Sequence, residues 1–448
     1  MSLNLKRTII VNDIKYVTSI ILLFLFAKSS YAQHLDDELN IPFKTSKEVM
    51  DDFMDQRFGM FIHWGPVTLR GTEIGWSRAR DVPAQEYDRL YEEFDPSLFD
   101  ANQWVKTAKD AGMKYLTITA KHHDGFCLWP TAYSDYNIMN SPFKVDVVGE
   151  LARACREQGI KFCIYFTVLD WHDPHYPIHS PDKQDEDPKA NMRLFVNTMK
   201  NQLKELVTNY DPYMLWFDGN WEKPWKRAYA VEIYNFLKKL KPDVIVNNRI
   251  GADHDHQLLT DQSIGDYATP EQKIGEFRLD FPWETCMTIC NQWAWKPNDP
   301  MKSLEQCVQT LVRTAGGNGN LLFNVGPMLD GRIEKRQIVR LREMGQWLTK
   351  NGESIYGTRG GPFKPTDDYV TTRKGNKIYV HVLDSTLNDL PLPIAKDKNK
   401  IKRVYMLDGE KVDFQRAYNE GVNLKIPANA KNTLCPVIVI EMQNPINI

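Results

Sequence analysis

The chain has 448 residues and is close to neutral, with 56 lysine and arginine residues against 58 aspartate and glutamate residues. This charge balance is a poor match to nucleic acid or to an anionic membrane surface as a partner. The length exceeds that of one ordinary domain and predicts a large domain together with a small one. Seven cysteines are scattered without any C-x-x-C pair, which argues against a disulfide framework and against a zinc cage.

Residues 1–32 have the features of a secretory signal peptide. Three basic residues precede an apolar stretch at 17–27, and Ser30 and Ala32 supply the small side chains that a signal peptidase reads. The apolar stretch is shorter than the roughly 20 residues of a spanning helix, so a membrane anchor is the less favoured interpretation. We therefore expect secretion across the inner membrane and cleavage before Gln33, with the mature chain periplasmic or extracellular and not attached to a membrane.

Two stretches, 100–120 and 146–168, repeat the same pattern. Each opens with an aspartate at a helix N-cap position and continues with apolar residues at helical spacing, then a glycine, a lysine and an apolar strand. Pro212 and Pro242 mark further turns from helix to strand. Helices that alternate with strands at this period predict parallel strands joined by right-handed crossovers.

Eight apolar segments are candidates for these strands, although the sixth is weakly marked. A closed (β/α)8 barrel of the TIM type is therefore favoured over an open doubly wound sheet. No G-x-G-x-x-G motif follows any of the segments, which also argues against a nucleotide-binding sheet. The expected strands are 58–63, 115–120, 161–168, 213–218, 243–248, 258–266, 284–290 and 320–325.

The pattern changes at the end of the barrel. A helix with apolar residues on one face is predicted at 334–351 and would complete the ring. Beyond residue 357, short alternating segments separated by polar residues predict a small antiparallel β-sandwich. We therefore divide the chain into a signal peptide (1–32), an α/β barrel domain (33–356) and a C-terminal β-sandwich domain (357–448).

Charged and aromatic residues follow the apolar strands. Asp218 ends the fourth strand, His122 and His123 follow the second, and Arg249 follows the fifth. The carboxyl ends of parallel barrel strands meet at one face, where such barrels build active sites. Carboxylates, imidazoles and indole rings together suit a polyhydroxylated ring, because its C–H faces stack on indole while its hydroxyls take directed hydrogen bonds. The pattern therefore points to a carbohydrate ligand.

Several motifs resemble, in order, those of glycoside hydrolase family 29, the α-L-fucosidases. The resemblance covers roughly residues 45–357. It implies a catalytic barrel, a C-terminal β-sandwich, hydrolysis with retained anomeric configuration, no metal or other cofactor, and fucosylated oligosaccharides or glycoconjugates as substrates. The motifs are Phe58-Gly-Met-Phe-Ile-His-Trp-Gly65, Lys121-His-His-Asp-Gly-Phe126, Leu215-Trp-Phe-Asp-Gly219, Asn247-Asn-Arg249, Thr269-Pro-Glu271, Pro282-Trp-Glu-Thr285 and Asn318–Pro327.

Two carboxylates carry the catalytic roles that the resemblance implies. Asp218 matches the nucleophile, which must be ionised to attack the anomeric carbon and form a glycosyl-enzyme. Glu271 matches the acid/base residue, which protonates the leaving oxygen and then deprotonates the incoming water. Glu284 is the rival for this second role, and Glu276 is a third candidate.

A further set of residues is expected to hold the sugar. The family usually has a Glu-Trp pair where this chain has Gly75-Trp76, so a contact of Glu73 with substrate stays open. One of the two adjacent histidines could alternatively prop its neighbour or a loop. The runs at 283–288 and 291–295 favour the branch that prefers α-1,3- and α-1,4-linked fucose. The expected substrate-binding residues are His63, Trp76, His122, His123, Trp216, Arg249, Glu284 and Trp293.

Three other functional classes remain open. A metal-dependent hydrolase is suggested by Asp253-His254-Asp255-His256 and by His122-His123, although adjacent histidines do not easily bind one tetrahedral ion. A lectin-like protein would bind fucose without cleaving it, because a fold does not fix a function. A purely structural interaction module would leave the carboxylates and indoles of the rim without a use. The enzyme is the favoured interpretation.

Overall fold

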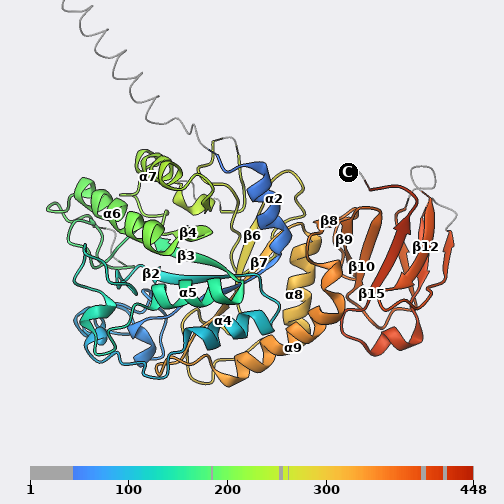
Figure 1. Ribbon diagram of the computed structural model, residues 1–448, viewed down its shortest axis with the longest axis horizontal. Coiled ribbons are helices and arrows are strands. Elements are labelled where there is room, and N and C mark those ends of the chain that lie inside the picture. The colour runs from blue at the N-terminus through green and yellow to red at the C-terminus, as the bar shows by residue number, and fades with distance from the viewer. Residues whose placement is uncertain are drawn as a thin grey trace, which may run out of the picture.

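The computed structural model describes residues 44–182, 185–251, 256–260, 262–394, 400–416 and 421–446. The expected signal peptide lies outside these residues. Within them, helices surround a parallel sheet, and the chain continues into a second unit of antiparallel strands, on the right of Figure 1. None of the helices in the described ranges combines the length and the apolar character that crossing a bilayer requires.

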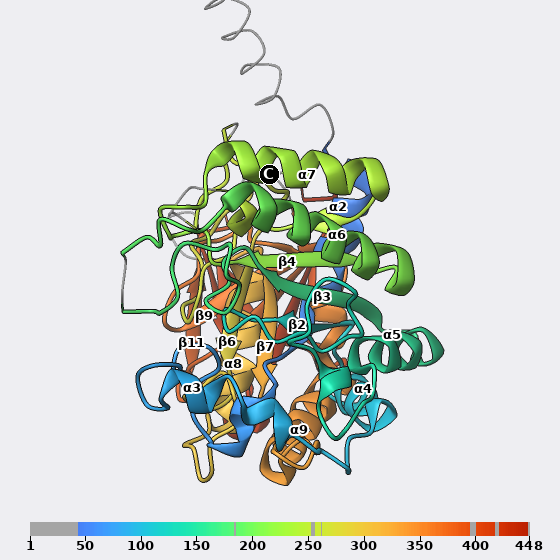
Figure 2. The same cartoon turned by 90° about the vertical axis from the view of Figure 1, so that its left-hand side faces the viewer.

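Seven parallel strands form the barrel sheet, in the order β5-β4-β3-β2-β1-β7-β6. Figure 2 shows helices α5, α6 and α7 outside strands β2, β3 and β4. The strands are β1 (Phe58–Ile62), β2 (Tyr115–Lys121), β3 (Lys161–Thr167), β4 (Met214–Asp218), β5 (Ile245–Val246), β6 (Glu284–Thr288) and β7 (Asn320–Val325). The helices are α2 (Lys47–Gln56), α3 (Ala84–Tyr87), α4 (Ala101–Asp110), α5 (Val147–Gln158), α6 (Met192–Tyr210), α7 (Arg227–Leu240), α8 (Leu304–Gly316) and α9 (Lys335–Asn351).

The eighth position of the barrel is occupied by single bridges instead of a strand. The strand expected at 258–266 is absent from the described part of that segment, so this prediction was wrong. Instead, Tyr267 pairs with Asn247 and Ala268 pairs with Trp283, both in parallel, which joins β5 to β6. The Asp266 carboxylate accepts a hydrogen bond from the Val246 N–H at 2.8 Å, so a side chain replaces part of the backbone ladder here. The prediction of a (β/α)8-type barrel is nevertheless confirmed.

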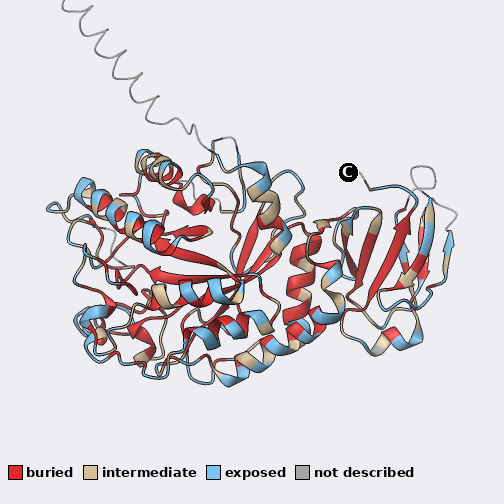
Figure 3. Ribbon diagram, viewed as in Figure 1, coloured by how far each residue is buried: buried red, intermediate tan, exposed pale blue. Residues whose placement is uncertain are grey.

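Local sequence signals fix the helix ends that precede the strands. The Asp100 carboxylate accepts from the Gln103 N–H, and the Asp146 carboxylate accepts from the Gly149 N–H, as N-caps do. Gly159 ends α5 in the left-handed conformation at φ 74°, which glycine adopts without a steric penalty. Figure 3 shows buried strands inside and outer helices with an exposed face, whereas α8, next to the C-terminal unit, is mostly buried.

Inward-facing side chains fill the barrel, because successive strand residues point to opposite faces. Tyr115, Tyr165 and Trp216 occupy this interior together with Phe53 and other apolar residues. Helix α2 carries Phe53 and closes the amino-terminal end of the barrel. The interior below the carboxyl end is therefore solid, and any ligand must bind at the rim.

The C-terminal unit is a sandwich of two antiparallel sheets, in agreement with the prediction. One sheet has the order β12-β15-β10-β9-β8 and the other the order β11-β14-β13. The unit packs against α8 and α9, where the Trp347 indole N–H donates to the Leu434 carbonyl at 2.9 Å. The strands are β8 (Arg359–Gly360), β9 (Tyr369–Lys374), β10 (Lys377–Val382), β11 (Asp389–Leu392), β12 (Ile401–Met406), β13 (Phe414–Arg416), β14 (Val422–Lys425) and β15 (Val437–Met442).

Candidate active site

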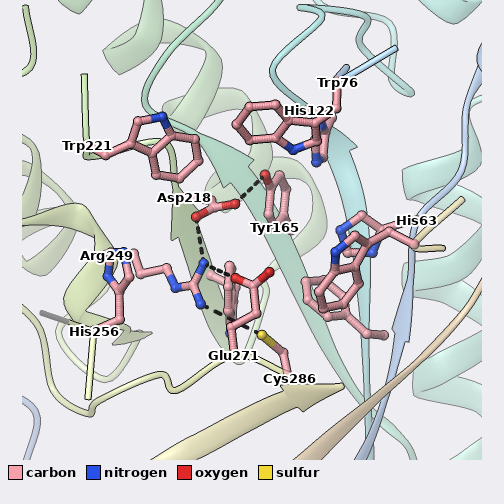
Figure 4. A pocket seen from close by; sticks show the side chains of 13 residues that line it. His63, Trp76, His122, Tyr165, Asp218, Trp221, Arg249, His256, Glu271 and Cys286 are labelled. Atoms are coloured by element: carbon pink, nitrogen blue, oxygen red, sulfur yellow. Dashed lines mark hydrogen bonds and ion pairs between the residues drawn. The ribbon is translucent and has the colours of Figure 1, made fainter. Parts of the chain in front are cut away.

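A cavity of about 400 Å³ opens at the carboxyl ends of the barrel strands, and Figure 4 shows its side chains. This volume is at the low end of the range for pockets that bind small molecules. The walls combine indole and imidazole rings with two carboxylates and one guanidinium group. The lining residues are Phe61, His63, Trp76, His122, Tyr165, Trp216, Asp218, Trp221, Arg249, His256, Glu271, Cys286 and Trp293.

Asp218 is the last residue of β4 and lies in the wall of this cavity. Its Oδ1 is 2.9 Å from Nη1 of Arg249, and its Oδ2 accepts a hydrogen bond from the Tyr165 hydroxyl at 3.1 Å. Burial alone would raise the pKa of Asp218, but the charge of Arg249 and its hydrogen bond outweigh burial and lower it. Asp218 is therefore held as a buried, ionised carboxylate.

Arg249 connects the two acidic residues of the cavity. The same Nη1 atom lies 2.9 Å from Asp218 and 2.8 Å from Oε2 of Glu271. The other guanidinium nitrogens donate to Thr269, to its hydroxyl and its carbonyl oxygen at 3.0 Å each. The guanidinium carbon lies 4.7 Å from the centroid of the Trp216 ring, which supports it from one side. These contacts hold the guanidinium group in one orientation around the site.

Glu271 faces Asp218 across this guanidinium. Its side chain is 41% exposed, in contrast to 12% for Asp218. Since one oxygen of each carboxylate lies within 3 Å of the same nitrogen atom, these two oxygens are less than about 6 Å apart. Retaining glycosidases have their two carboxyl groups about 5–5.5 Å apart, whereas inverting enzymes need about 6.5–9.5 Å. This upper limit for the two oxygens lies below the inverting range and agrees with the retaining one.

Three histidines near the cavity are neutral. Burial lowers the pKa of His63 to about 3 and that of His123 to about 4, and it lowers the pKa of His122 well below its usual value. Nδ1 of His63 lies 2.7 Å from Oδ1 of Asn324, an oxygen that can only accept, so Nδ1 carries the proton. Nε2 of His63 is therefore a hydrogen-bond acceptor. Neutral imidazoles of this kind can bind sugar hydroxyls without changing the charge of the site.

Aromatic rings form the remaining walls. Trp76 and Trp221 lie nearly parallel, with centroids 5.8 Å apart and an interplanar angle of 19°. Trp293 packs on His63 at 4.8 Å. Indole faces at the mouth of a cavity suit the apolar C–H surface of a sugar.

Comparison with known proteins decides the family. The family model described as "Alpha-L-fucosidase" matches residues 25–353. The chain belongs to the alpha-L-fucosidase family. The plasma alpha-L-fucosidase of Homo sapiens is 33% identical to it over 346 residues, which cover 71% of each chain. The members of this family are glycoside hydrolases, so the prediction of an enzyme of this class is confirmed.

Solved structures of fucosidases share the fold. Alpha-L-fucosidase isoenzyme 1 from Paenibacillus thiaminolyticus superposes with a TM-score of 0.81 at 31% identity, over 89% of this chain and 99% of that one. A GH29 alpha-L-fucosidase from Bacteroides thetaiotaomicron gives a TM-score of 0.81 at 29% identity, over 90% and 97%. A further structure of the Bacteroides thetaiotaomicron fucosidase is of a trapped covalent intermediate with 2-fluoro-fucosyl fluoride. A covalent intermediate is the hallmark of retention.

Most of the sequence-predicted site residues of this fucosidase-family chain meet in the cavity. Asp218, Glu271, Arg249, His63, His122 and the tryptophans Trp76, Trp216 and Trp293 all line it. His123 does not line it but lies behind Asp218, with Nε2 3.6 Å from Oδ2 of Asp218 and Nδ1 2.8 Å from the Thr167 hydroxyl. Of the adjacent histidines, His122 therefore faces the cavity and His123 supports its wall.

Glu284 lies elsewhere than the sequence prediction placed it. It is 0% exposed and is not among the residues that line the cavity. Its carboxylate accepts hydrogen bonds from the Trp216 indole N–H and from the hydroxyls of Tyr115 and Tyr267. The expectation of a direct substrate contact is not supported, because the strand residue next to Trp283 points into the barrel interior below the cavity. Glu276, the third acid/base candidate, is also outside the lining.

Glu73 has a structural role that the sequence left open. Its carboxylate accepts from the backbone N–H groups of Trp293 and Ala294, both at 2.9 Å. It thus joins the loop that carries Trp76 to the loop that carries Trp293. Both of these tryptophans line the cavity.

Five lining residues were not among the expected catalytic or substrate-binding residues: Phe61, Tyr165, Trp221, His256 and Cys286. Tyr165 could have been found from strand alternation, since it shares the inward face of β3 with Thr167 and is in register with Trp216 of β4. Among the described residues, no group of three or more histidine, cysteine, aspartate or glutamate side chains is arranged to hold a metal ion. Residues 253–255 of the suggested metal motif lie outside the described ranges.

Proposed function

We propose that this chain is an exo-acting, retaining α-L-fucosidase with Asp218 as nucleophile and Glu271 as acid/base. The observation that carries the proposal is the attachment of both carboxylates to one nitrogen of Arg249 in the wall of one cavity. The upper limit of about 6 Å that these contacts set for one oxygen pair supports a double-displacement enzyme. A cavity of about 400 Å³ suits one terminal sugar and favours release of single fucose units.

In the first step, an Asp218 oxygen attacks the anomeric carbon while Glu271 gives its proton to the leaving oxygen. Asp218 can attack because the charge of Arg249 lowers its pKa despite burial. Glu271 can reach the leaving group because its side chain is the more exposed of the two and lies at the open side of the cavity. The departing glycan leaves toward solvent.

In the second step, Glu271 removes a proton from the water that hydrolyses the glycosyl-enzyme. The water oxygen attacks the anomeric carbon, the bond between that carbon and Asp218 breaks, and Asp218 leaves as a carboxylate while Glu271 keeps the proton.

The substrate and the location of the enzyme are also part of the proposal. Neutral His63 and His122 supply directed hydrogen bonds, and Trp293 and Trp76 supply apolar faces, for a deoxyhexose at the end of a fucosylated glycan. The runs at 283–288 and 291–295 support a preference for α-1,3 and α-1,4 linkages. The signal-peptide pattern of residues 1–32 supports secretion to the periplasm or outside the cell.

The nucleophile assignment is tested with Asp218→Ala. The variant should lose at least about 1,000-fold in kcat on nitrophenyl α-L-fucoside, because the glycosyl-enzyme cannot form. Azide should restore turnover and give a fucosyl azide of inverted configuration, which NMR identifies. An active Asp218→Ala variant without azide would remove the assignment, and a wild-type protein that binds fucose without turnover would favour the lectin-like alternative.

The acid/base assignment is tested with Glu271→Ala and two substrates. Loss of proton donation should slow a fucosylated oligosaccharide by about 100-fold or more, while nitrophenyl fucoside, whose leaving group needs no proton, should be affected much less. Glu276→Ala, which changes a glutamate of the same loop outside the cavity, is the matched control and should leave both rates close to wild type. Equal loss on both substrates with Glu271→Ala would contradict the assignment.

A further inference from the structure

A completely buried glutamate lies beneath the active-site cavity. Glu284 is the first residue of β6, and its side chain points into the barrel interior, where it is 0% exposed. Three donors surround its carboxylate: the Trp216 indole N–H at 3.1 Å, the Tyr267 hydroxyl at 3.5 Å, and the Tyr115 hydroxyl. In the described part of the chain no basic side chain forms an ion pair with it. A carboxyl group in such a place costs desolvation energy, so an apolar side chain would be easier to accommodate.

The Trp216 indole, which donates to Glu284, contacts both Arg249 and Tyr165, the two residues that bind Asp218. On one side, the Arg249 guanidinium lies over the Trp216 ring, 4.7 Å from its centroid. On the other, Tyr165 stacks on the same indole at 5.6 Å and 16°, and the Tyr165 hydroxyl donates to Asp218. The edge of the indole is fixed by Glu284, and its faces carry the two groups that bind Asp218.

We infer that Glu284 is a positioning residue, which fixes the Trp216 indole and through it the Arg249 guanidinium that holds Asp218 and Glu271. This inference rests on the proposed function, since it concerns the geometry of the proposed catalytic pair. The indole N–H is a donor only, so it needs an acceptor at this buried point. Without the carboxylate, the N–H is left unsatisfied and the ring is free to tilt, which moves the guanidinium above it.

The Trp216 indole lies between Glu284 and the cavity, so Glu284 has no direct access to the substrate. It does not line the cavity, and the indole ring that it binds is itself part of the cavity lining. Burial raises the pKa of Glu284 to about 7, against the opposite effect of its three hydrogen bonds. A raised pKa is also expected of an acid/base residue, so the choice between positioning and proton transfer depends on access to substrate and on the behaviour of variants.

Glu284→Gln separates the two roles. The amide oxygen can accept from Trp216 and Tyr267 as the carboxylate does, and the NH2 group can donate to the Tyr115 hydroxyl oxygen. If Glu284 positions Trp216, Glu284→Gln should keep kcat within about threefold of wild type on both nitrophenyl fucoside and a fucosylated oligosaccharide. If Glu284 transfers a proton, Glu284→Gln should instead lose oligosaccharide turnover selectively, and the inference would be overturned.

Glu284→Met removes the acceptor while it fills a similar volume. We expect kcat to fall about 30-fold, equally for the two substrates and without rescue by azide, because the geometry of both catalytic carboxylates changes. Trp216→Phe removes the same hydrogen bond from the other side and should give a comparable loss. The double variant should lose little more than either single one, since both changes break one interaction. An additive double variant would contradict the inference.

Two tyrosine variants serve as matched controls. Tyr115→Phe and Tyr267→Phe each remove one donor to Glu284 but keep its bond to Trp216, so kcat should stay within about threefold. If Glu284→Met lowers the melting temperature as Tyr115→Phe does while kcat is unchanged, Glu284 is only a structural residue and the inference fails. Failure of the proposed function is recognised separately, because it would appear as an active Asp218→Ala variant whatever Glu284 does.

Discussion

The buried carboxyl group of Glu284 should make the stability of this protein depend on pH in a way that one substitution removes. Burial raises its pKa in the folded state from 4.5 to about 7. The unfolded chain therefore releases this proton at lower pH than the folded chain does. The stability that the carboxyl group contributes is fully present below pH 4.5 and is lost as the pH rises to about 7. Glu284→Gln keeps the size of the side chain and abolishes the titration.

The size of the effect follows from the shift. A change of 2.5 in pKa corresponds to about 3 kcal/mol of free energy of unfolding. Most of this is lost between pH 5 and pH 8, so over that interval the wild type should lose about 2–3 kcal/mol relative to Glu284→Gln. The free energy of unfolding of Glu284→Gln minus that of the wild type should therefore be larger at pH 8 than at pH 5.

Urea unfolding followed by tryptophan fluorescence, at pH 5 and at pH 8, measures the difference between the two proteins. All other titrating groups are common to both, so their contributions cancel in this difference. Glu157→Gln, which changes an exposed glutamate on α5, is the control and should follow the wild type at both pH values. Parallel behaviour of the wild type and Glu284→Gln would refute a Glu284 pKa near 7 and the burial argument behind it.

Three further results are expected. Arg249→Met removes the charge that lowers the pKa of Asp218, so the acidic limb of the pH profile of kcat/KM should move to higher pH. An acidic limb that does not move would show that another group keeps Asp218 ionised. Glu73→Ala leaves the Trp293 and Ala294 N–H groups without their acceptor and should raise KM about 5–10-fold. Glu92→Ala on the exposed surface is the control and should leave KM unchanged. Equal KM values for the two variants would mean that the two loops hold their positions without Glu73. Dialysis against EDTA should leave turnover unchanged, because the proposed mechanism assigns both catalytic functions to Asp218 and Glu271. Loss of activity that a divalent metal restores would favour the metal-dependent alternative.

Much of the site could be predicted from sequence because it lies at strand ends. Asp218 follows a short apolar run, and residues in that position reach the rim of any parallel barrel. The same reasoning placed His122 and Arg249. Glu284 was misplaced because a strand residue reaches the rim only when it lies at the carboxyl end. Glu284 begins its strand, as the strand expected at 284–290 already implied, and therefore lies a layer deeper, where the register pairs it with the first residue of β7.

The resemblance to the fucosidase family, and not a local pattern, singled out Glu271. Local patterns in the sequence determined the alternation of helices and strands, the N-caps at Asp100 and Asp146, the antiparallel second unit and the place of Asp218 at the end of a strand. These depend on the chemistry of neighbouring residues along the chain. Only the tertiary structure decided that the sixth strand is reduced to bridges at Tyr267 and Ala268, and that one nitrogen of Arg249 holds both carboxylates. The physical reason is that such features depend on distances between segments far apart in the chain, which closure of the barrel sets and no local pattern encodes.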